Sequence, residues 1–251
     1  MMSMLSFKAS EVRYEPYPLF VLRPAMDPAL YDQLSATFPD ASLFTTLDNY
    51  HKQTLSEKYN PENYHRFIEE NPVWKRFHAW IKSDAFIRQV VDFLGANHVD
   101  LELKRCFEPA ARRFKRELKH GKFPTRPPRL TSRFEFSSLK ADGGEVAPHT
   151  DTPKKIITLV LSMIRDGEWD PSFGGNLDVN RTSDPAFAFN FTDRQVPWES
   201  VEVIESIPFV PNQCMVFVKT FNSLHSVRKM TQTGSTALRK TVTIVIEKRD
   251  N

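Results

Sequence analysis

The residues of this chain whose types and spacing could hold a metal ion are His149 and Asp151, two positions apart in the segment A-P-H-T-D-T-P. In an extended backbone, side chains two residues apart leave the same face, so an imidazole nitrogen and a carboxylate oxygen could reach one cation. His225 is the candidate third ligand, from a distant strand. Two histidines and one carboxylate occupy one face of an octahedral iron(II) ion and leave three positions open. The pattern therefore predicts a metal centre with room for reactants.

A second pair with the same spacing, His98 and Asp100, competes for this role. A histidine and an aspartate two residues apart are by themselves only a weak indication of a metal site. His225 taken alone could be a core or turn histidine. The pair at 98–100 follows an expected helix end, whereas the pair at 149–151 precedes a β-rich run at 156–164. This context favours His149 and Asp151 as the ligands.

The order of short motifs around these residues resembles that of the iron(II)/2-oxoglutarate-dependent oxygenase superfamily, and is closest to its prolyl-4-hydroxylase-like branch. The motifs are H-T-D at 149–151, G-G-N-L at 174–177, P-N-Q-x-x-V-F at 211–217, L-H-S-V at 224–227 and R-K-T at 239–241. The resemblance covers about residues 130–248 and rests on the conjunction of motifs. Residues 1–125 carry no motif of this family.

The resemblance implies a double-stranded β-helix, a jelly-roll or cupin-like barrel with the metal at one open end. It implies iron(II) as the metal, with 2-oxoglutarate as co-substrate and O2 as oxidant. His149 and Asp151 match the proximal ligands of the family, and His225 matches the distal ligand. The implied activity is hydroxylation of a C–H bond with release of succinate and CO2. A carboxylate at Asp151 favours hydroxylation, because related halogenases carry a small residue there.

The resemblance also points to residues for the co-substrate. Arg239 matches the basic residue that pairs with the far carboxylate of 2-oxoglutarate, and a guanidinium can grip a carboxylate with two hydrogen bonds. Thr241 or Thr243 could add a hydroxyl contact, and Thr158 is a further candidate. Arg228 is the competing anion partner, but Arg239 is favoured because a β-branched run follows it.

One position departs from the family pattern. The branch often has a tyrosine for the co-substrate on the strand after the first two ligands, and Ser162 stands at the comparable place. The separation between His225 and Arg239 is also somewhat long for the branch. A longer hairpin at 231–235 would absorb the difference.

Three other interpretations stay open at this point. The chain could be a non-catalytic jelly-roll binding protein, another cupin-type metalloenzyme, or a peptidyl-prolyl hydroxylase if its substrate is a protein. A small-molecule or glycan substrate is favoured over a protein. The basic residues expected near the barrel mouth would favour an anionic substrate or form a solvated basic loop, and the oligomeric state is open. These residues are Arg126, Arg129, Arg133, Lys154 and Lys155.

The elements that must position these residues fall into two regions of one structural unit. Residues 1–125 are expected to form a helical region packed on the barrel, and residues 126–251 the double-stranded β-helix core. Helices are expected over 29–38, from Asn71-Pro72 onward, and from Ser83 or Asp84 to about Gly95. A basic loop with several prolines at 118–130 marks the change of architecture.

Short β-rich runs separated by turn residues predict the strands of the barrel. The fold class is therefore mainly β with helical N-terminal additions. A long segment at 166–197, rich in phenylalanine, could form a lid or pack onto the barrel. The expected strands are 133–139, 156–164, 176–179, 201–209, 215–219 and 241–247.

Composition and charge limit the partners and the cellular location that can be expected. A net charge of +3 is too small to predict a nucleic-acid partner. The longest apolar run, at 156–164, has the length of a strand and not of a membrane span. Two widely separated cysteines, Cys106 and Cys214, are typical of reduced thiols in a cytoplasmic protein. No targeting segment is recognised at the N-terminus, so a cytoplasmic location is expected.

Overall fold

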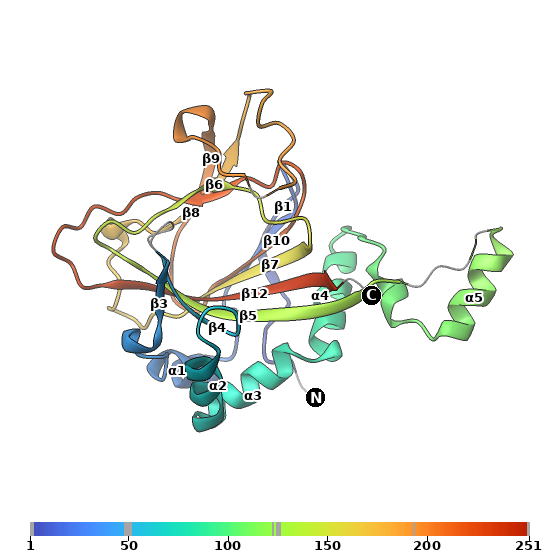
Figure 1. Cartoon of the computed structure of the whole chain (residues 1–251), viewed down its shortest axis with the longest axis horizontal. Coiled ribbons are helices and arrows are strands. Elements are labelled where there is room, and N and C mark those ends of the chain that lie inside the picture. Colours follow the sequence, from blue (N-terminus) through green and yellow to red (C-terminus); the bar gives the residue numbers. More distant parts are fainter. Residues whose placement is uncertain (1–2, 48–51, 122, 124–126, 193, 250–251) are drawn as a thin grey trace.

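Two antiparallel sheets face each other in the computed structural model, which describes residues 3–47, 52–121, 123, 127–192 and 194–249 (Figure 1). The smaller sheet has the strand order β6 (Val146–His149), β11 (His225–Val227), β8 (Leu177–Arg181) and β9 (Glu202–Ile207). The larger sheet has the order β1 (Ala9–Arg13), β2 (Leu19–Leu22), β10 (Cys214–Val218), β7 (Lys155–Ser162), β12 (Leu238–Arg249), β5 (Arg129–Lys140), β4 (Lys52–Ser56) and β3 (Thr45–Leu47). The prediction of a mainly β, jelly-roll architecture with N-terminal helices is confirmed.

Strand β12 lies at the centre of the larger sheet and sorts its residues between two environments. Val242, Ile244 and Ile246 belong to the apolar core on the outer side of the sheet. Because side chains alternate along a strand, Arg239 and Thr241 point to the inner side, toward the smaller sheet. The polar residues at the start of β12 thus face the interior of the barrel, which makes the interior the candidate functional surface.

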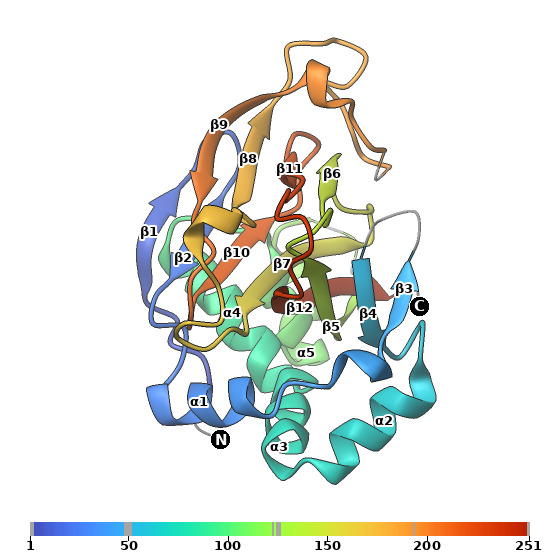
Figure 2. The same ribbon diagram turned by 90° about the vertical axis from the view of Figure 1, so that its left-hand side faces the viewer.

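Helices cover the outer side of the larger sheet, as the two perpendicular views show (Figures 1 and 2). Their aromatic side chains pack edge-on against the sheet; Trp74 and Phe136, for example, have ring centroids 4.8 Å apart. Burial of each such large side chain contributes on the order of 1.5–3 kcal/mol. The covering helices are α1 (Pro28–Ala36), α2 (Pro61–Glu70), α3 (Pro72–Ile81) and α4 (Asp84–Ala96), and α5 (Ala110–Lys119) lies apart from them.

The expected helix starts occur where the capping residues are. The side chain of Asp27 accepts a hydrogen bond from the Leu30 N–H, and that of Ser83 accepts one from the Phe86 N–H. Helix α4 ends at Ala96, one residue beyond the expectation at Gly95, and the residue in the left-handed conformation is His98, with φ of 58°. N-caps such as Asp27 and Ser83 satisfy N–H groups in the first turn of a helix, which have no partner within the helix.

The N-terminal half supplies strands as well as the expected helices. Strands β1 to β4 extend the larger sheet at both edges, whereas the sequence predicts a helical region there. Strand β2 has only four residues, all buried, and a short apolar run does not distinguish a strand from a helix. The boundary at residues 125/126 stays a prediction. Short 3-10 turns occur at Ala41–Leu43, Leu103–Phe107, Pro171–Phe173 and Trp198–Ser200.

Both ends of the segment expected as a basic loop at 118–130 belong to regular elements, because α5 runs to Lys119 and β5 begins at Arg129. Helix α5 extends away from the barrel (Figure 1). Arg126 falls outside the described residues. Cys106 and Cys214 are free thiols. In the part of the chain that is described, none of the helices is long and apolar enough to cross a membrane.

Candidate metal centre

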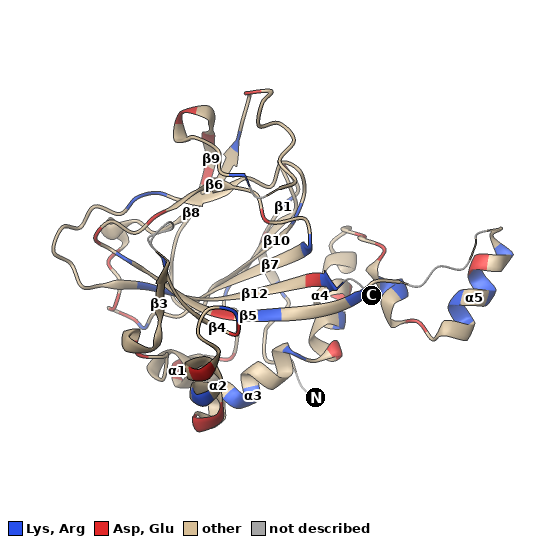
Figure 3. Cartoon of the chain, viewed as in Figure 1, with Lys and Arg blue, Asp and Glu red and all other residues tan. Residues whose placement is uncertain are grey.

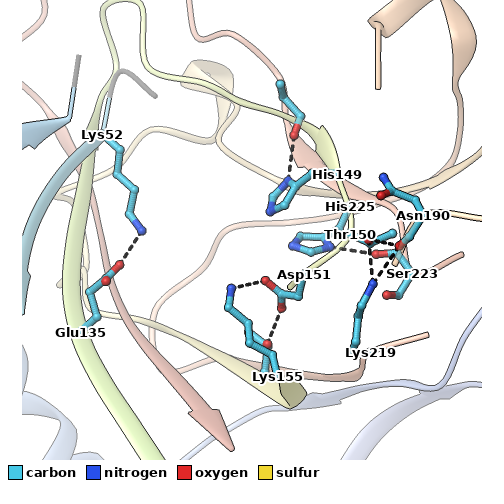
Figure 4. A network of polar contacts seen from close by, with 12 residues as sticks. Lys52, Glu135, His149, Thr150, Asp151, Lys155, Asn190, Lys219, Ser223 and His225 are labelled. Carbon is cyan, nitrogen blue, oxygen red and sulfur yellow. Dashed lines mark hydrogen bonds and ion pairs between the residues drawn. The ribbon is translucent and has the colours of Figure 1, made fainter. Parts of the chain in front are cut away.

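Three side chains converge at one end of the smaller sheet (Figure 4). His149 ends β6, Asp151 follows two residues later, and His225 begins β11. Strands β6 and β11 are paired with His225 opposite His149, and the two ring centroids are 4.4 Å apart. One ligand atom from each of the three residues lies within 4.8 Å of the other two. Within the described ranges, this is the one group of at least three such side chains with that geometry.

The backbone fixes the tautomer of both imidazoles. Nδ1 of His149 lies 2.9 Å from the carbonyl oxygen of Ala147, and Nδ1 of His225 lies 3.0 Å from that of Ser223. A carbonyl oxygen can only accept, so each Nδ1 carries the proton and donates it. Nε2 of each ring is therefore the nitrogen that can bind a metal.

Asp151 is held on both carboxylate oxygens. Oδ1 accepts from the ammonium of Lys155, and Oδ2 accepts from the hydroxyl of Thr158 at 2.5 Å. Burial by itself raises the pKa of Asp151, but the charge of Lys155 and the neighbouring imidazoles outweigh it and leave the pKa well below its ordinary value. The carboxylate is thus ionised and oriented before any cation binds.

Burial lowers the pKa of His225 to about 3, and the nearby His149 adds to this effect. The imidazole is therefore neutral near pH 7, and a cation need not displace a proton from it. Two imidazoles and one ionised carboxylate on one side of a cation form the donor set that suits iron(II). The residues present fit this metal.

Thr158 and Lys155 thus have contacts that the sequence did not reveal. The sequence made Thr158 a co-substrate candidate, and the structure places its hydroxyl on Asp151. The contact depends on how the start of β7 folds back beside the ligand segment. Lys155 was expected only as part of a basic rim, and it lies directly on the ligand carboxylate (Figure 4).

Arg239 is buried on the inner face of β12, with 4% of its surface exposed. Its Nε donates to the carbonyl oxygen of Gly175 at 2.5 Å, and its guanidinium stacks on Phe209 at 4.4 Å. Its Nη2 is buried without a hydrogen-bond partner, and burial lowers the pKa to about 10. A buried guanidinium with an unused donor suits a carboxylate ligand.

The other residues considered for the co-substrate lie in different places. Thr241 is buried beside Ser137, with the two hydroxyl oxygens 3.4 Å apart. It is paired across the sheet with Ser162, whose hydroxyl is buried without a hydrogen-bond partner. Arg228, the competing anion partner, has a side chain 67% exposed and pairs with Asp178 at 3.2 Å. Of the two arginines, only Arg239 therefore points to the interior of the barrel.

His98 and Asp100 are separate from the centre and have local roles at the end of α4. Both are exposed, and Oδ1 of Asp100 accepts the N–H of Glu102 at 2.8 Å. These contacts stabilise the turn after the helix and explain the second histidine–aspartate pair without a metal.

Part of the long segment at 182–197 is anchored to the ligand strand. The carbonyl oxygen of Asn190 accepts from the hydroxyl of Thr150, which lies between the two proximal ligands, and from Lys219 at 2.9 Å. The N–H of Val196 donates to the carbonyl oxygen of Pro148 at 2.7 Å. The segment therefore packs against the rim of the centre.

An ion pair that the sequence gave no signal for faces the same interior. Glu135 and Lys52 lie on neighbouring strands of the larger sheet, with Nζ 2.6 Å from Oε1. Figure 4 places them across from the three metal-binding side chains. Burial would raise the pKa of Glu135, and Lys52 reverses this, so the carboxylate is ionised.

Comparisons with known proteins give distant structural likenesses. A prolyl hydroxylase from Trichoplax adhaerens, in complex with a peptide fragment of hypoxia inducible factor, matches with a TM-score of 0.48 and 9% identity over 91% of this chain and 83% of that chain. A Pseudomonas putida prolyl-4-hydroxylase matches with a TM-score of 0.45 and 12% identity over 92% of both chains. A 2-oxoglutarate/iron(II) oxygenase family protein from Burkholderia pseudomallei matches with a TM-score of 0.42 and 11% identity over 91% of this chain and 84% of that chain.

No family model matches the sequence, and the search of curated proteins gives no match. The His-x-Asp…His group is present in this chain. Because each likeness is distant, we base the function on the geometry of the three converging side chains.

Proposed function

We propose that this protein is an iron(II)- and 2-oxoglutarate-dependent oxygenase that hydroxylates a C–H bond, with release of succinate and CO2. The observation that carries the proposal is the convergence of His149, Asp151 and His225, with one ligand atom of each within 4.8 Å of the others. Bound iron(II) and 2-oxoglutarate would supply the oxidising chemistry that places an oxygen atom from O2 in a C–H bond.

The chain's own residues would hold and orient the reactants. His149 and His225 present Nε2, because their Nδ1 protons are donated to backbone carbonyls. Thr158 fixes the rotation of the Asp151 carboxylate, so that its orientation does not depend on the cation. Such supporting contacts orient ligands and tune the affinity for the metal.

Arg239 is proposed to bind the far carboxylate of 2-oxoglutarate. Two buried donors without a partner support this role, Nη2 of Arg239 and the hydroxyl of Ser162. Burying a polar group without a hydrogen bond costs free energy, and a bound carboxylate would supply the missing partner. Thr241, paired with Ser162 across the sheet, would add a hydroxyl contact. Ser162 is shorter than the tyrosine of the related branch and would leave more space.

We propose a small molecule or a glycan as the substrate, in preference to a protein. The segment at 182–197 is anchored over the rim through Asn190 and Val196, which favours a compact ligand over an extended polypeptide. A peptidyl-prolyl hydroxylase is the alternative outcome of a substrate screen.

The test is a succinate-release assay with pools of small molecules, glycans and peptides, run beside His149→Ala as a metal-site control. Substrate-stimulated succinate formation that is lost in His149→Ala supports the proposal. Stimulated succinate formation that persists in His149→Ala contradicts it. A chain that binds metal and 2-oxoglutarate but turns over none of the pools would be a binding protein with the same fold.

A further inference from the structure

A polar cavity lies at the end of β4, next to the start of β5. Its volume is about 210 Å³, and it is lined by residues from the end of β4, the start of β5 and the end of β12. Figure 3 shows basic positions at the start of β5 and the end of β12. None of the proposed roles in metal or co-substrate binding uses this cavity.

The lining of the cavity is predominantly positive. Four of its side chains are cationic, those of Lys58, Lys82, Arg133 and Arg249, and two are carboxylates. One carboxylate, Glu57, is already paired with Lys82 at 3.1 Å. The other three cations therefore face one remaining carboxylate, so the cavity has the electrostatic character of an anion site.

Two polar atoms in the cavity wall are buried without a hydrogen-bond partner in the described part of the chain. They are Oγ of Ser56, a residue only 2% exposed, and Nε of Arg133. Leaving a buried donor unsatisfied costs on the order of 1–3 kcal/mol. An oxyanion in the cavity could accept from both groups, and a charge-assisted bond to a guanidinium is the stronger kind.

The strand register connects this cavity to the metal centre. Arg133 on β5 is paired with Val245 on β12, and Val245 is paired with Thr158 on β7. Residues paired across strands share a face, so Arg133 is on the interior face with Thr158, two strands or roughly 10 Å away. Thr158 donates to the ligand Asp151. An anion held at Arg133 would therefore lie one small molecule's length from the centre.

We propose that this cavity binds an anionic group of the substrate, a phosphate, sulfate or carboxylate, and presents the rest of the molecule to the metal. The proposal rests on the proposed oxygenase function for its second half, while anion binding itself does not depend on that function. Arg133 would be the main anchor, with Ser56 as a hydroxyl donor. The substrate class is thus an anionic small molecule or an anionic glycan.

Calorimetric titration of the full chain with inorganic phosphate tests the anion site directly. Wild type should bind phosphate saturably, and Arg133→Gln should weaken binding by about tenfold or more, the loss expected for a charge-assisted contact. Ser56→Ala should weaken it by about threefold, because a neutral hydroxyl contact is weaker, and this small change keeps the test valid if Arg133→Gln folds poorly. Arg228→Gln, at an exposed arginine outside the cavity, should bind as wild type does.

Two further arms separate this site from the metal centre. Phosphate affinity should be the same in His149→Ala and in the presence of saturating 2-oxoglutarate. Where turnover is measurable, phosphate should raise the KM of the substrate and leave kcat unchanged. Absence of saturable phosphate binding, wild-type affinity in Arg133→Gln, or competition by 2-oxoglutarate would each overturn the anion site. Loss of succinate formation with phosphate binding intact would count against the oxygenase proposal alone.

Discussion

Replacing Thr158 by valine removes one hydroxyl and keeps the shape of the side chain. That hydroxyl donates to Oδ2 of Asp151 at 2.5 Å, and the aspartate side chain is only 4% exposed, so water cannot easily take its place. The carboxylate stays ionised, because Lys155 still contacts Oδ1. The variant thus tests the orientation of a metal ligand without removing the ligand.

The size of the effect follows from these contacts. A hydrogen bond to a charged group contributes about 1.5–3 kcal/mol, and about 1.4 kcal/mol corresponds to a tenfold change in affinity. Since one of the two contacts of Asp151 remains, the lower end of that range applies. We expect Thr158→Val to bind a divalent metal about tenfold more weakly than wild type.

The assay is calorimetric titration with cobalt(II) in the absence of O2 and 2-oxoglutarate. Thr54→Val is the matched control, because Thr54 is also buried on the larger sheet but donates to the backbone carbonyl of Phe136 at 3.3 Å. The control should lose stability but keep the metal affinity of wild type. Equal cobalt affinity in Thr158→Val and wild type, or an equal loss in Thr54→Val, would refute the reasoning.

Three further predictions concern charged and titratable side chains. Lys155→Met should bind cobalt(II) several-fold more tightly than wild type in the same titration. The reason is that the lysine ammonium repels a cation bound to Asp151. Weaker binding would contradict this prediction and show that Lys155 supports the site. Arg239→Gln should raise the Kd for 2-oxoglutarate by at least about tenfold and leave the metal affinity unchanged. Arg228→Gln is the control. An equal rise of the Kd in both variants would contradict the assignment of Arg239 to the co-substrate. The free energy of unfolding, measured in urea, should fall as the pH falls from 6.5, the ordinary pKa of histidine, toward about 4. The buried His225 and His78 have pKa values of about 3 and about 4 in the folded chain, so in this pH range they bind protons only in the unfolded chain. Equal unfolding free energies at about pH 5 and about pH 7 would contradict the third prediction.

The sequence predicts the strands of the barrel and the ligand positions because both depend on local information. The spacing of His149 and Asp151 places them on one face of an extended segment, and β-branched runs such as that in β12 identify strands without knowledge of their partners. His225 becomes a ligand only because β11 pairs with β6, and motif order was the sole sequence signal for it.

The remaining contacts depend on strand register and on where the chain reverses direction. The spacing of residues along the chain does not reveal either. The contacts of Lys155 and Thr158 with Asp151 arise where β7 begins after a tight return. The pairing of Lys52 with Glu135, and the cavity around Arg133, require β4 from the N-terminal half beside β5. Short strands such as β2 to β4 carry too few residues for their periodicity to identify them.

The most direct test of the centre is the visible charge-transfer absorption that iron(II) develops when it binds 2-oxoglutarate, recorded without O2. Wild type should show the band only when both iron(II) and 2-oxoglutarate are present, and His149→Ala and His225→Ala should lose it. An unchanged band in either variant would contradict the assignment of iron to these three side chains.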